Sequence, residues 1–396
     1  MDGHGPNIAL AMLIIFGSAK LLAELFERVG QPAIVGEILA GVLVGPSLLN
    51  WIQPNLVLTA LSELGVMFLL FRVGLEVKPS DLMRVGGVAA LVAALGVIVP
   101  LATGWAIMRA AGYPQVESLF VGAAMVATSV GITAQVLASQ GLLHLVSSKV
   151  ILAAAVIDDV LGLIVLAIVS SMARGNVNVV EIGTTAGLAI GFTVLIATVG
   201  SRTAARFVPQ AGKRLRSGEA QFNIALVVLF GLSVLAIYAG VAAIIGAFLA
   251  GLALAESVEQ RVRDMAHGIS ELLVPFFLAG IGLRLEVSAF SDPRLLLLSV
   301  AILAAAVLSK LTGCGLGAFQ LGWRKMVQIG CGMVPRGEVG MVVAQLGLSL
   351  GVIEKPVYAL VVFMAVATTL VAPPLLKLSF RGEERQEQPV EQFQIG

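Results

Sequence analysis

Long apolar runs separated by short polar segments occupy almost the whole of this 396-residue chain. A helix needs about 20 apolar residues to cross a bilayer, with a range of roughly 17–25. The boundary at Ala239 and Gly240 is the least distinct, because one long bent helix is an alternative there. The pattern predicts an all-α polytopic membrane protein of about 13 transmembrane helices. The runs cover residues 8–26, 32–49, 56–75, 85–109, 117–140, 146–173, 179–200, 220–238, 240–256, 269–285, 294–319, 326–350 and 356–378.

Composition supports a membrane protein and excludes several functions. Hydrophobic residues make up 58% of the chain and charged residues only 12%, against about 25% charged residues in soluble domains. The net charge of +1 gives no basis for a nucleic-acid partner. Cys314 and Cys331 lie in or beside apolar runs and are expected to be small core residues rather than a disulfide. The three histidines lie far apart and show no metal-ligand spacing. We expect no cofactor and no enzyme activity.

The distribution of Lys and Arg orients the predicted helices. With the N-terminus outside, the inner loops hold sixteen basic residues and the outer segments five, while the remaining four of the 25 lie within spans. Because positive charge accumulates on the cytoplasmic side, we expect the N-terminus outside and the C-terminus inside, in the cell's inner (plasma) membrane.

Two segments of the chain recur in the same order. PAIVGEILAGVLV (32–44) aligns with AAIIGAFLAGLAL (242–254), and ELGVMFLLFRVGLEV (63–77) aligns with ELLVPFFLAGIGLRL (271–285), at offsets of 210 and 208. An odd number of predicted spans separates the copies, so the second copy enters the membrane from the opposite side. Inverted repeats of this kind are typical of secondary transporters, which bind substrate near the midplane at the repeat interface.

The fifth span of the first half and its counterpart in the second half both contain helix-weakening residues. MVATSVGIT (125–133) carries Thr128 and Ser129, and MVPRGEVGMVV (333–343) carries Pro335 between its apolar residues. Proline removes a backbone donor and disfavours a continuous helix. Paired interrupted spans in the two halves point to a transport site. Two kinked but continuous helices are the alternative.

Seven charged residues lie at membrane depth, where each costs about 2.5–3.5 kcal/mol on insertion scales. For the adjacent pair in AAVIDDVLGLIV (154–165) a functional role is favoured. A structural ion pair or helix cap is favoured for Arg336 and Glu338, and a structural role for Glu37 and Arg72. Lys20 and Glu24, four residues apart, are expected to form a simple ion pair. The seven are Glu37, Arg72, Asp158, Asp159, Lys310, Arg336 and Glu338.

Helix geometry gives the two aspartates different partners. Adjacent helical residues point about 100° apart, so one carboxylate can face Lys310 while the other faces a water-filled cavity. Desolvation disfavours the charged form of a carboxyl group, so the cavity-facing group can exchange a proton near physiological pH. Hard cations prefer oxygen ligands, which Thr128, Ser129 and unwound carbonyls supply. A proton and a cation then compete for one carboxylate, and that competition is an exchange mechanism.

These motifs together resemble a known family. GAAMVATSVGITAQVL, ILAAAVIDDVLGLIVL, VLSKLTG and GMVPRGEVGMVVAQLGL are similar to the monovalent cation:proton antiporter superfamily, and within it to the NapA-type bacterial sodium/proton antiporters of the second branch. The resemblance extends over about residues 8–378.

The resemblance implies a role for each site residue. Asp159 is the ion- and proton-binding carboxylate and the sodium ligand, with Asp158 as a second possible ligand. Asp158 is the partner of Lys310, and Thr128 and Ser129 line the site. Arg336 and Glu338 match a charged pair in the second interrupted helix. The transported ions are protons and sodium or lithium.

The resemblance also implies a division of the chain into domains. The implied transport domain moves like an elevator against a dimerisation domain, and the protein forms a homodimer. The implied ranges are 1–84 and 217–293 for dimerisation, 85–173 and 294–380 for transport, 174–216 for a linker helix with a cytoplasmic loop, and 381–396 for a disordered tail.

Other functions fit these residues less well. Potassium-efflux relatives commonly have Gln in place of the first Asp, so Asp158 favours sodium over a potassium/proton antiporter. A sodium-driven solute symporter shares the inverted-repeat layout and is a second alternative. An intramembrane aspartyl protease needs carboxylates that converge from two helices, whereas Asp158 and Asp159 are adjacent on one. A channel is disfavoured because the predicted site closes around Lys310.

Overall fold

The computed structural model describes residues 8–173, 179–200, 203, 220–285 and 292–383. Within these ranges every regular element is a helix. Nine helical segments there are long and apolar enough to cross a membrane. The helices are α1 (Ile8–Arg28), α2 (Ala33–Val44), α3 (Leu56–Glu76), α4 (Pro79–Ala110), α5 (Gln115–Val126), α6 (Val130–Ser139), α7 (Val146–Ala173), α8 (Val179–Leu195), the π-helical turn η1 (Ile196–Gly200), α10 (Ala220–Tyr238), α11 (Ala243–Leu254), α12 (Gln260–Leu283), α13 (Pro293–Gly317), the 3₁₀ turn η3 (Phe319–Leu321), α14 (Trp323–Gly332), α15 (Glu338–Ser349) and α16 (Lys355–Ser379).

The predicted apolar runs correspond to helices, with differences at their ends. Each of the thirteen runs overlaps a helix or a pair of helices, while thirteen crossings stays a prediction. The uncertain boundary resolves into two helices, because Gly240 adopts a φ of +78° between them. Helix α12 begins at Gln260 rather than at 269. Its added turns are amphipathic and bury Val262 and Ala266, so the helix extends beyond the apolar run.

The predicted repeat recurs in the packing of the helices, while the inversion of its second copy stays a prediction. Glycine contacts recur at the offsets seen in the sequence. A Cβ at Gly36 of α2 would meet the Leu22 carbonyl of α1, and one at Gly246 of α11 would meet the Leu232 carbonyl of α10. These close approaches require glycine. The contacts between α2 and α12 likewise reappear between α11 and α3.

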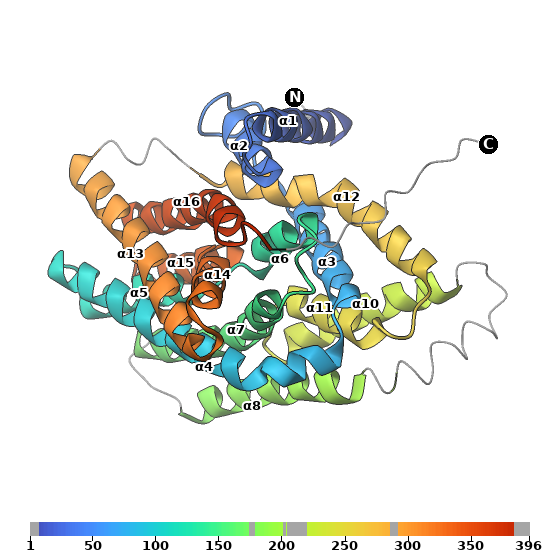
Figure 1. The fold of residues 1–396 in the computed structure, drawn as a ribbon. Coiled ribbons are helices and arrows are strands. Elements are labelled where there is room, and N and C mark those ends of the chain that lie inside the picture. Colours follow the sequence, from blue (N-terminus) through green and yellow to red (C-terminus); the bar gives the residue numbers. More distant parts are fainter. Residues whose placement is uncertain (1–7, 174–178, 201–202, 204–219, 286–291, 384–396) are drawn as a thin grey trace.

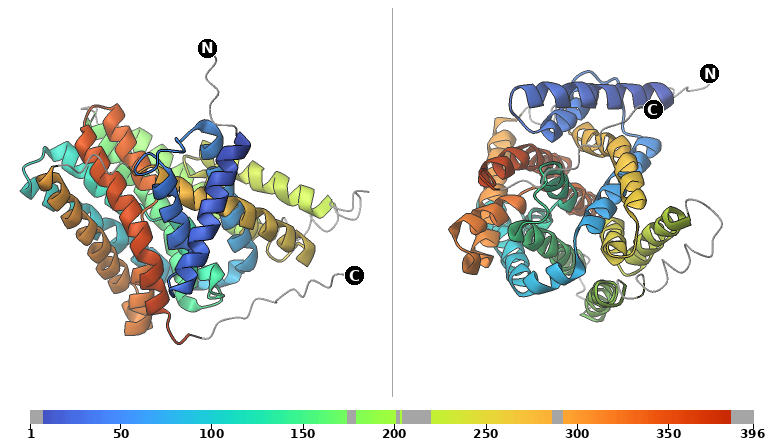
Figure 2. Two further views of the ribbon diagram at one scale, coloured as in Figure 1. Left: turned by 90° about the horizontal axis from the view of Figure 1, so that it is seen from above. Right: turned by 45° about the vertical axis from the view of Figure 1, so that its right-hand side comes forward.

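The helices pack in two groups (Figures 1 and 2). One group contains α1, α2, α3, α10, α11 and α12, and the other contains α4–α7 and α13–α16. Fewer contacts join the groups, among them α3 with α6 and α16 with α2. Helix α8 contacts α7, and η1 contacts α11. The functional division into a dimerisation and a transport domain stays a prediction.

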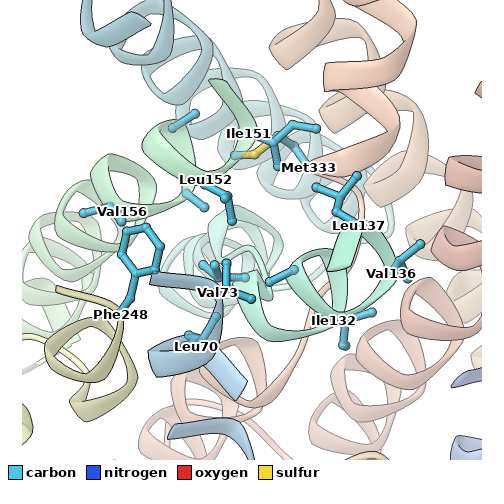
Figure 3. Packing of buried hydrophobic residues seen from close by; sticks show 14 of the residues in the cluster. Leu70, Val73, Ile132, Val136, Leu137, Ile151, Leu152, Val156, Phe248 and Met333 are labelled. Carbon is cyan, nitrogen blue, oxygen red and sulfur yellow. The ribbon is translucent and has the colours of Figure 1, made fainter. Parts of the chain in front are cut away.

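A buried apolar cluster fills part of the boundary between the two groups (Figure 3). The members labelled in Figure 3 come from α3, α6, α7 and α11, together with Met333 after the end of α14. Val73 of α3, Phe248 of α11 and Val156 of α7 are each less than 8% exposed. Val156 lies one helical turn before Asp159, so the cluster extends along the face of α7 that carries this carboxylate.

One predicted ion pair is wrong. The ammonium of Lys20 lies 3.0 Å from Oε1 of Glu37, and Glu24 instead accepts from Arg28 at 2.8 Å. Glu37 is 4% exposed. A buried carboxylate is costly without a partner, whereas an exposed i,i+4 pair contributes little. Lys20 therefore pairs with the buried Glu37 rather than with the exposed Glu24.

Candidate functional site

Two interrupted helices meet at the centre of the second helix group. The chain is non-helical at 127–129, between α5 and α6, and at 333–337, between α14 and α15. The amide of Ser129 donates to the carbonyl of Pro335 at 2.8 Å. Gly337 lies against Ser129, because a Cβ on this glycine would stand 2.6 Å from the serine Oγ. The breaks therefore face each other, and the alternative of continuous kinked helices is wrong.

Side chains and backbone at the crossing satisfy groups that the helix ends leave free. Thr133 of α6 donates from Oγ1 to the carbonyl of Gly332, the last residue of α14, at 2.6 Å. Thr128 is 2% exposed, and its Oγ1 has no hydrogen-bond partner among the described residues. Ser129 is 8% exposed. The crossing thus contains buried oxygen atoms of the type that bind hard cations.

The predicted ion pair between Asp158 of α7 and Lys310 is present. Nζ of Lys310, on α13, lies 2.9 Å from Oδ1 and 3.1 Å from Oδ2 of Asp158. Both of these side chains are fully buried. Asp159 is 7% exposed, and both of its carboxylate oxygens are buried. In this conformation Lys310 engages Asp158.

The face of α7 that carries Asp159 lies against the end of α5. Gly162, three residues further along α7, lies next to Val126, since a Cβ there would be 3.9 Å from the Val126 side chain. Residues three apart share a helix face. Val126 is the last residue of α5, so the face of α7 that carries Asp159 packs toward the C-terminal end of that helix.

Arg336 is a fully buried residue of the second break. Its guanidinium donates to the carbonyls of Met333 at 3.2 Å and Ala306 at 3.3 Å. Two threonines of α16 also bind its backbone, Thr369 donating to its carbonyl at 2.6 Å and Thr368 accepting from its amide at 3.1 Å. This arginine holds the non-helical segment in place and lies within electrostatic range of Asp158. The side chain of Glu338 lies outside the described part of the chain.

Sequence reasoning missed a glycine beside the ion pair. A Cβ on Gly96 of α4 would stand 2.6 Å from Sγ of Cys314, 3.3 Å from Nζ of Lys310 and 3.8 Å from Oδ1 of Asp158. Cys314 is buried and free, as predicted, and so is Cys331. The only signal available beforehand was the glycine itself within an apolar run, and the chain has 44 glycines.

Comparison with known proteins gives a family. The model for the sodium/hydrogen exchanger transmembrane family matches residues 11–381. The chain is 33% identical to the Na+/H+-K+ antiporter GerN of Bacillus cereus, over 96% of this chain and 97% of that one. It is also 33% identical to the high-affinity Na+/H+ antiporter NhaS3 of Synechocystis, over 97% and 92% of the two chains.

A solved structure has the same fold. It is that of the sodium proton antiporter MjNhaP1 from Methanocaldococcus jannaschii, with a TM-score of 0.67, 16% identity, and coverage of 94% of this chain and 96% of that chain. At this identity the likeness establishes the fold alone. The family assignment rests on the sequence matches across nearly the whole chain. The protein therefore belongs to the sodium/hydrogen exchanger family of transmembrane transport proteins.

Proposed function

We propose that this protein exchanges sodium or lithium for protons across the membrane, and that the cation and the proton compete for the carboxylate of Asp159. The observation that carries the proposal is the division of labour between adjacent aspartates. Lys310 bonds both oxygens of Asp158, and Asp159 lies on the face of α7 that packs toward the end of α5. Two neighbouring carboxylates thereby have separate functions.

In each exchange step one monovalent cation replaces another at the carboxylate of Asp159, so the net charge of the site is unchanged. The carboxyl group of Asp159 releases its proton to water and binds a sodium ion, while Thr128, Ser129 and backbone carbonyls of the breaks supply further oxygen ligands. On the other side of the membrane the sodium ion leaves and a proton returns. Alternating access requires that the site open to one side at a time. Because one occupant displaces the other, the two flows are coupled.

The charged residues around the site have supporting roles in this proposal. Lys310 neutralises Asp158 and adds a second titratable group, released when the ion pair opens. Arg336 keeps a positive charge near Asp158 while its donors hold carbonyls of α13 and the break. Glu338, at the start of α15, completes the predicted charged pair of the second interrupted helix.

We further propose the assembly and orientation that go with this function. The protein would be a homodimer in the inner membrane, with its N-terminus outside and its C-terminus in the cytoplasm. The α1–α3 and α10–α12 group would form the dimer, and the group that carries Asp159 would move against it like an elevator.

Potassium is the second candidate cation. GerN, one of the most similar relatives found, is named as an antiporter of both sodium and potassium. The presence of Asp158 in place of the glutamine common among potassium-efflux relatives favours sodium. Direct competition between the ions decides the selectivity.

The test uses proteoliposomes with an imposed pH gradient. Addition of sodium, lithium or potassium should dissipate the gradient for the wild type, and Asp159→Asn should abolish this response. Asp264→Asn is the matched control, because Asp264 is an exposed carboxylate of α12 that accepts from Gln260. Full activity in Asp159→Asn would refute the site, and dissipation without added cation would refute antiport. Dissipation that also needs an organic solute would indicate a symporter.

A further inference from the structure

A cavity of about 380 Å³ opens at the C-terminal end of α16. Its walls come from the last turns of α16, from the turn that follows that helix, and from the turn between α1 and α2. The lining residues are Gly30, Gln31, Pro374, Lys377, Leu378, Phe380, Arg381, Gly382 and Glu383. The cavity therefore lies at the end of a helix long and apolar enough to span a membrane, and neither aspartate of α7 lines it.

Two cations line this cavity without a carboxylate partner among the described residues. Nζ of Lys377 donates to the carbonyl of Gly30 at 2.6 Å, which fixes the ammonium at the cavity and leaves two of its three N–H donors. Arg381 has an exposed side chain. The one acidic lining residue, Glu383, is already neutralised, because it lies 3.3 Å from Arg324 and accepts from Gln328 at 2.8 Å. The lining is therefore net positive.

These two cations are not needed to cap α16. A helix end leaves carbonyls that basic side chains often satisfy. Here backbone amides bind the carbonyls of Leu376 and Leu378, Gln328 donates to that of Ser379, and Arg324 donates to that of Arg381. The remaining N–H donors of Lys377 and Arg381 are therefore available to an acceptor in the cavity.

We propose that this cavity binds a phosphate-bearing anion, held by Lys377 and Arg381. The guanidinium fork pairs with two phosphate oxygens at once, and the ammonium acts as a point charge. Basic pockets at the cytoplasmic ends of transmembrane helices bind lipid headgroups, and a free phosphate offers the same oxygens. The bound anion also adds a bridge between the α1–α2 turn and α16, alongside the contact between Gly30 and Lys377. Because these elements belong to the two different helix groups, occupancy restrains their relative movement.

The test measures binding to the purified full-length protein and needs no transport. Two probes distinguish the sources of phosphate: dioleoyl phosphatidylglycerol, scored by retention in native mass spectrometry, and inorganic phosphate, scored by thermal shift at constant ionic strength. The variant is Lys377→Gln with Arg381→Gln. The matched control is Lys78→Gln with Arg84→Gln, which removes two exposed cations at the start of α4.

We expect the control to bind as the wild type does and the cavity variant to bind at least about tenfold more weakly, since each basic residue adds to the attraction of an anionic headgroup. Retention of the lipid with no phosphate shift identifies a headgroup site, and a shift with both probes identifies a general phosphate site. Equal loss in both double variants, or no loss in either, overturns the proposal. If the double variant aggregates, Arg381→Gln alone decides, because no hydrogen bond of its guanidinium is found among the described residues; unchanged binding there also overturns it.

Discussion

The ammonium of Lys310 contacts both carboxylate oxygens of Asp158, at 2.9 and 3.1 Å, and neither side chain is exposed to solvent. Withdrawing two charges from water costs several kcal/mol for each ion, and mutual attraction compensates only when the geometry is good. Removing one partner therefore leaves the other charge buried and unpaired, whereas removing both leaves no buried charge at this position. This asymmetry makes the pair testable by stability alone.

Lys310→Gln should destabilise the protein strongly, in the direction of the roughly 3–5 kcal/mol that a stranded buried charge costs. Arg336 lies within electrostatic range of Asp158, so we expect the lower part of that range. The double variant Lys310→Gln with Asp158→Asn should recover much of the loss. Thermal unfolding of the detergent-purified protein compares the wild type, Lys310→Gln, Asp158→Asn and the double variant. A double variant as unstable as the sum of its singles would contradict the ion-pair explanation.

Gly96→Ala should destabilise the protein and disturb the ion pair, because the added methyl would stand 2.6 Å from Sγ of Cys314 and 3.3 Å from Nζ of Lys310. Overpacking of this kind costs about 1–3 kcal/mol. Adding Cys314→Ala removes the closest clashing atom and should restore part of the stability. Melting temperature and exchange rate in proteoliposomes are the measurements.

The control for this prediction lies on the same helix. Gly87 of α4 has no atom within 4 Å of the position that a Cβ would occupy. Gly87→Ala should be neutral or stabilising by up to about 1 kcal/mol, because alanine is the better helix former. If both alanines behave alike, the packing beside Lys310 has no special role.

The sequence predicts most of the architecture because the quantities involved are large. Thirteen apolar runs and a pair of aspartates at membrane depth each represent several kcal/mol of transfer free energy, and such terms are visible in a single chain. The repeat was visible because Gly36 and Gly41 recur as Gly246 and Gly251. Pro335 marked the second break through its missing backbone donor.

The features that the sequence does not predict depend on contacts between residues far apart in the chain. Gly96 is one of many glycines, and its importance comes from the approach of Cys314 and Lys310 on another helix. Lys20 has a candidate partner four residues away, yet it pairs with Glu37, because an unpaired charge costs more free energy on the buried Glu37 than on an exposed carboxylate. Polar side chains were predictable as a group, but their partners follow from packing.

Thr133→Val should destabilise the crossing, because the carbonyl of Gly332 loses the donor that lies 2.6 Å away. An unsatisfied buried polar group costs about 1–3 kcal/mol. Thr133→Ser keeps the hydroxyl and should stay close to the wild type. Thr312 of α13 is exposed and bonds its own helix at Leu308, so Thr312→Val is expected to change the melting temperature little. Equal effects at the two threonines would show that the bond across the crossing contributes nothing.

The inverted repeat predicts equal sensitivity at equivalent glycines. A Cβ at Gly41 of α2 would meet the backbone of Ala279 on α12, and one at Gly251 of α11 would meet that of Phe71 on α3. Backbone atoms cannot rotate away, so Gly41→Ala and Gly251→Ala should each cost at least about 1–3 kcal/mol.

Gly17 and Gly231 provide the matched controls for the repeat, because a Cβ added at either would have no atom within 4 Å. Alanine at either should be tolerated or slightly stabilising. Expression yield, monodispersity and melting temperature separate the two classes. If alanine is tolerated at Gly41 but strongly destabilises the protein at Gly251, or the reverse, the two glycines do not have equivalent roles in the two halves.

Competition at Asp159 predicts how the apparent KM for sodium depends on pH. A proton and a sodium ion exclude each other from the same carboxylate, so below the pKa of the site the apparent KM should rise by up to about tenfold for each unit that pH falls, while the maximal rate at saturating sodium changes far less. Asp159→Glu keeps a titratable carboxyl group and should retain a pH-dependent KM with an altered midpoint. The measurement is initial sodium-dependent proton movement in proteoliposomes across a pH series. A maximal rate that falls with pH while KM stays constant would mean that protons act elsewhere, and one carboxylate would no longer account for the coupling.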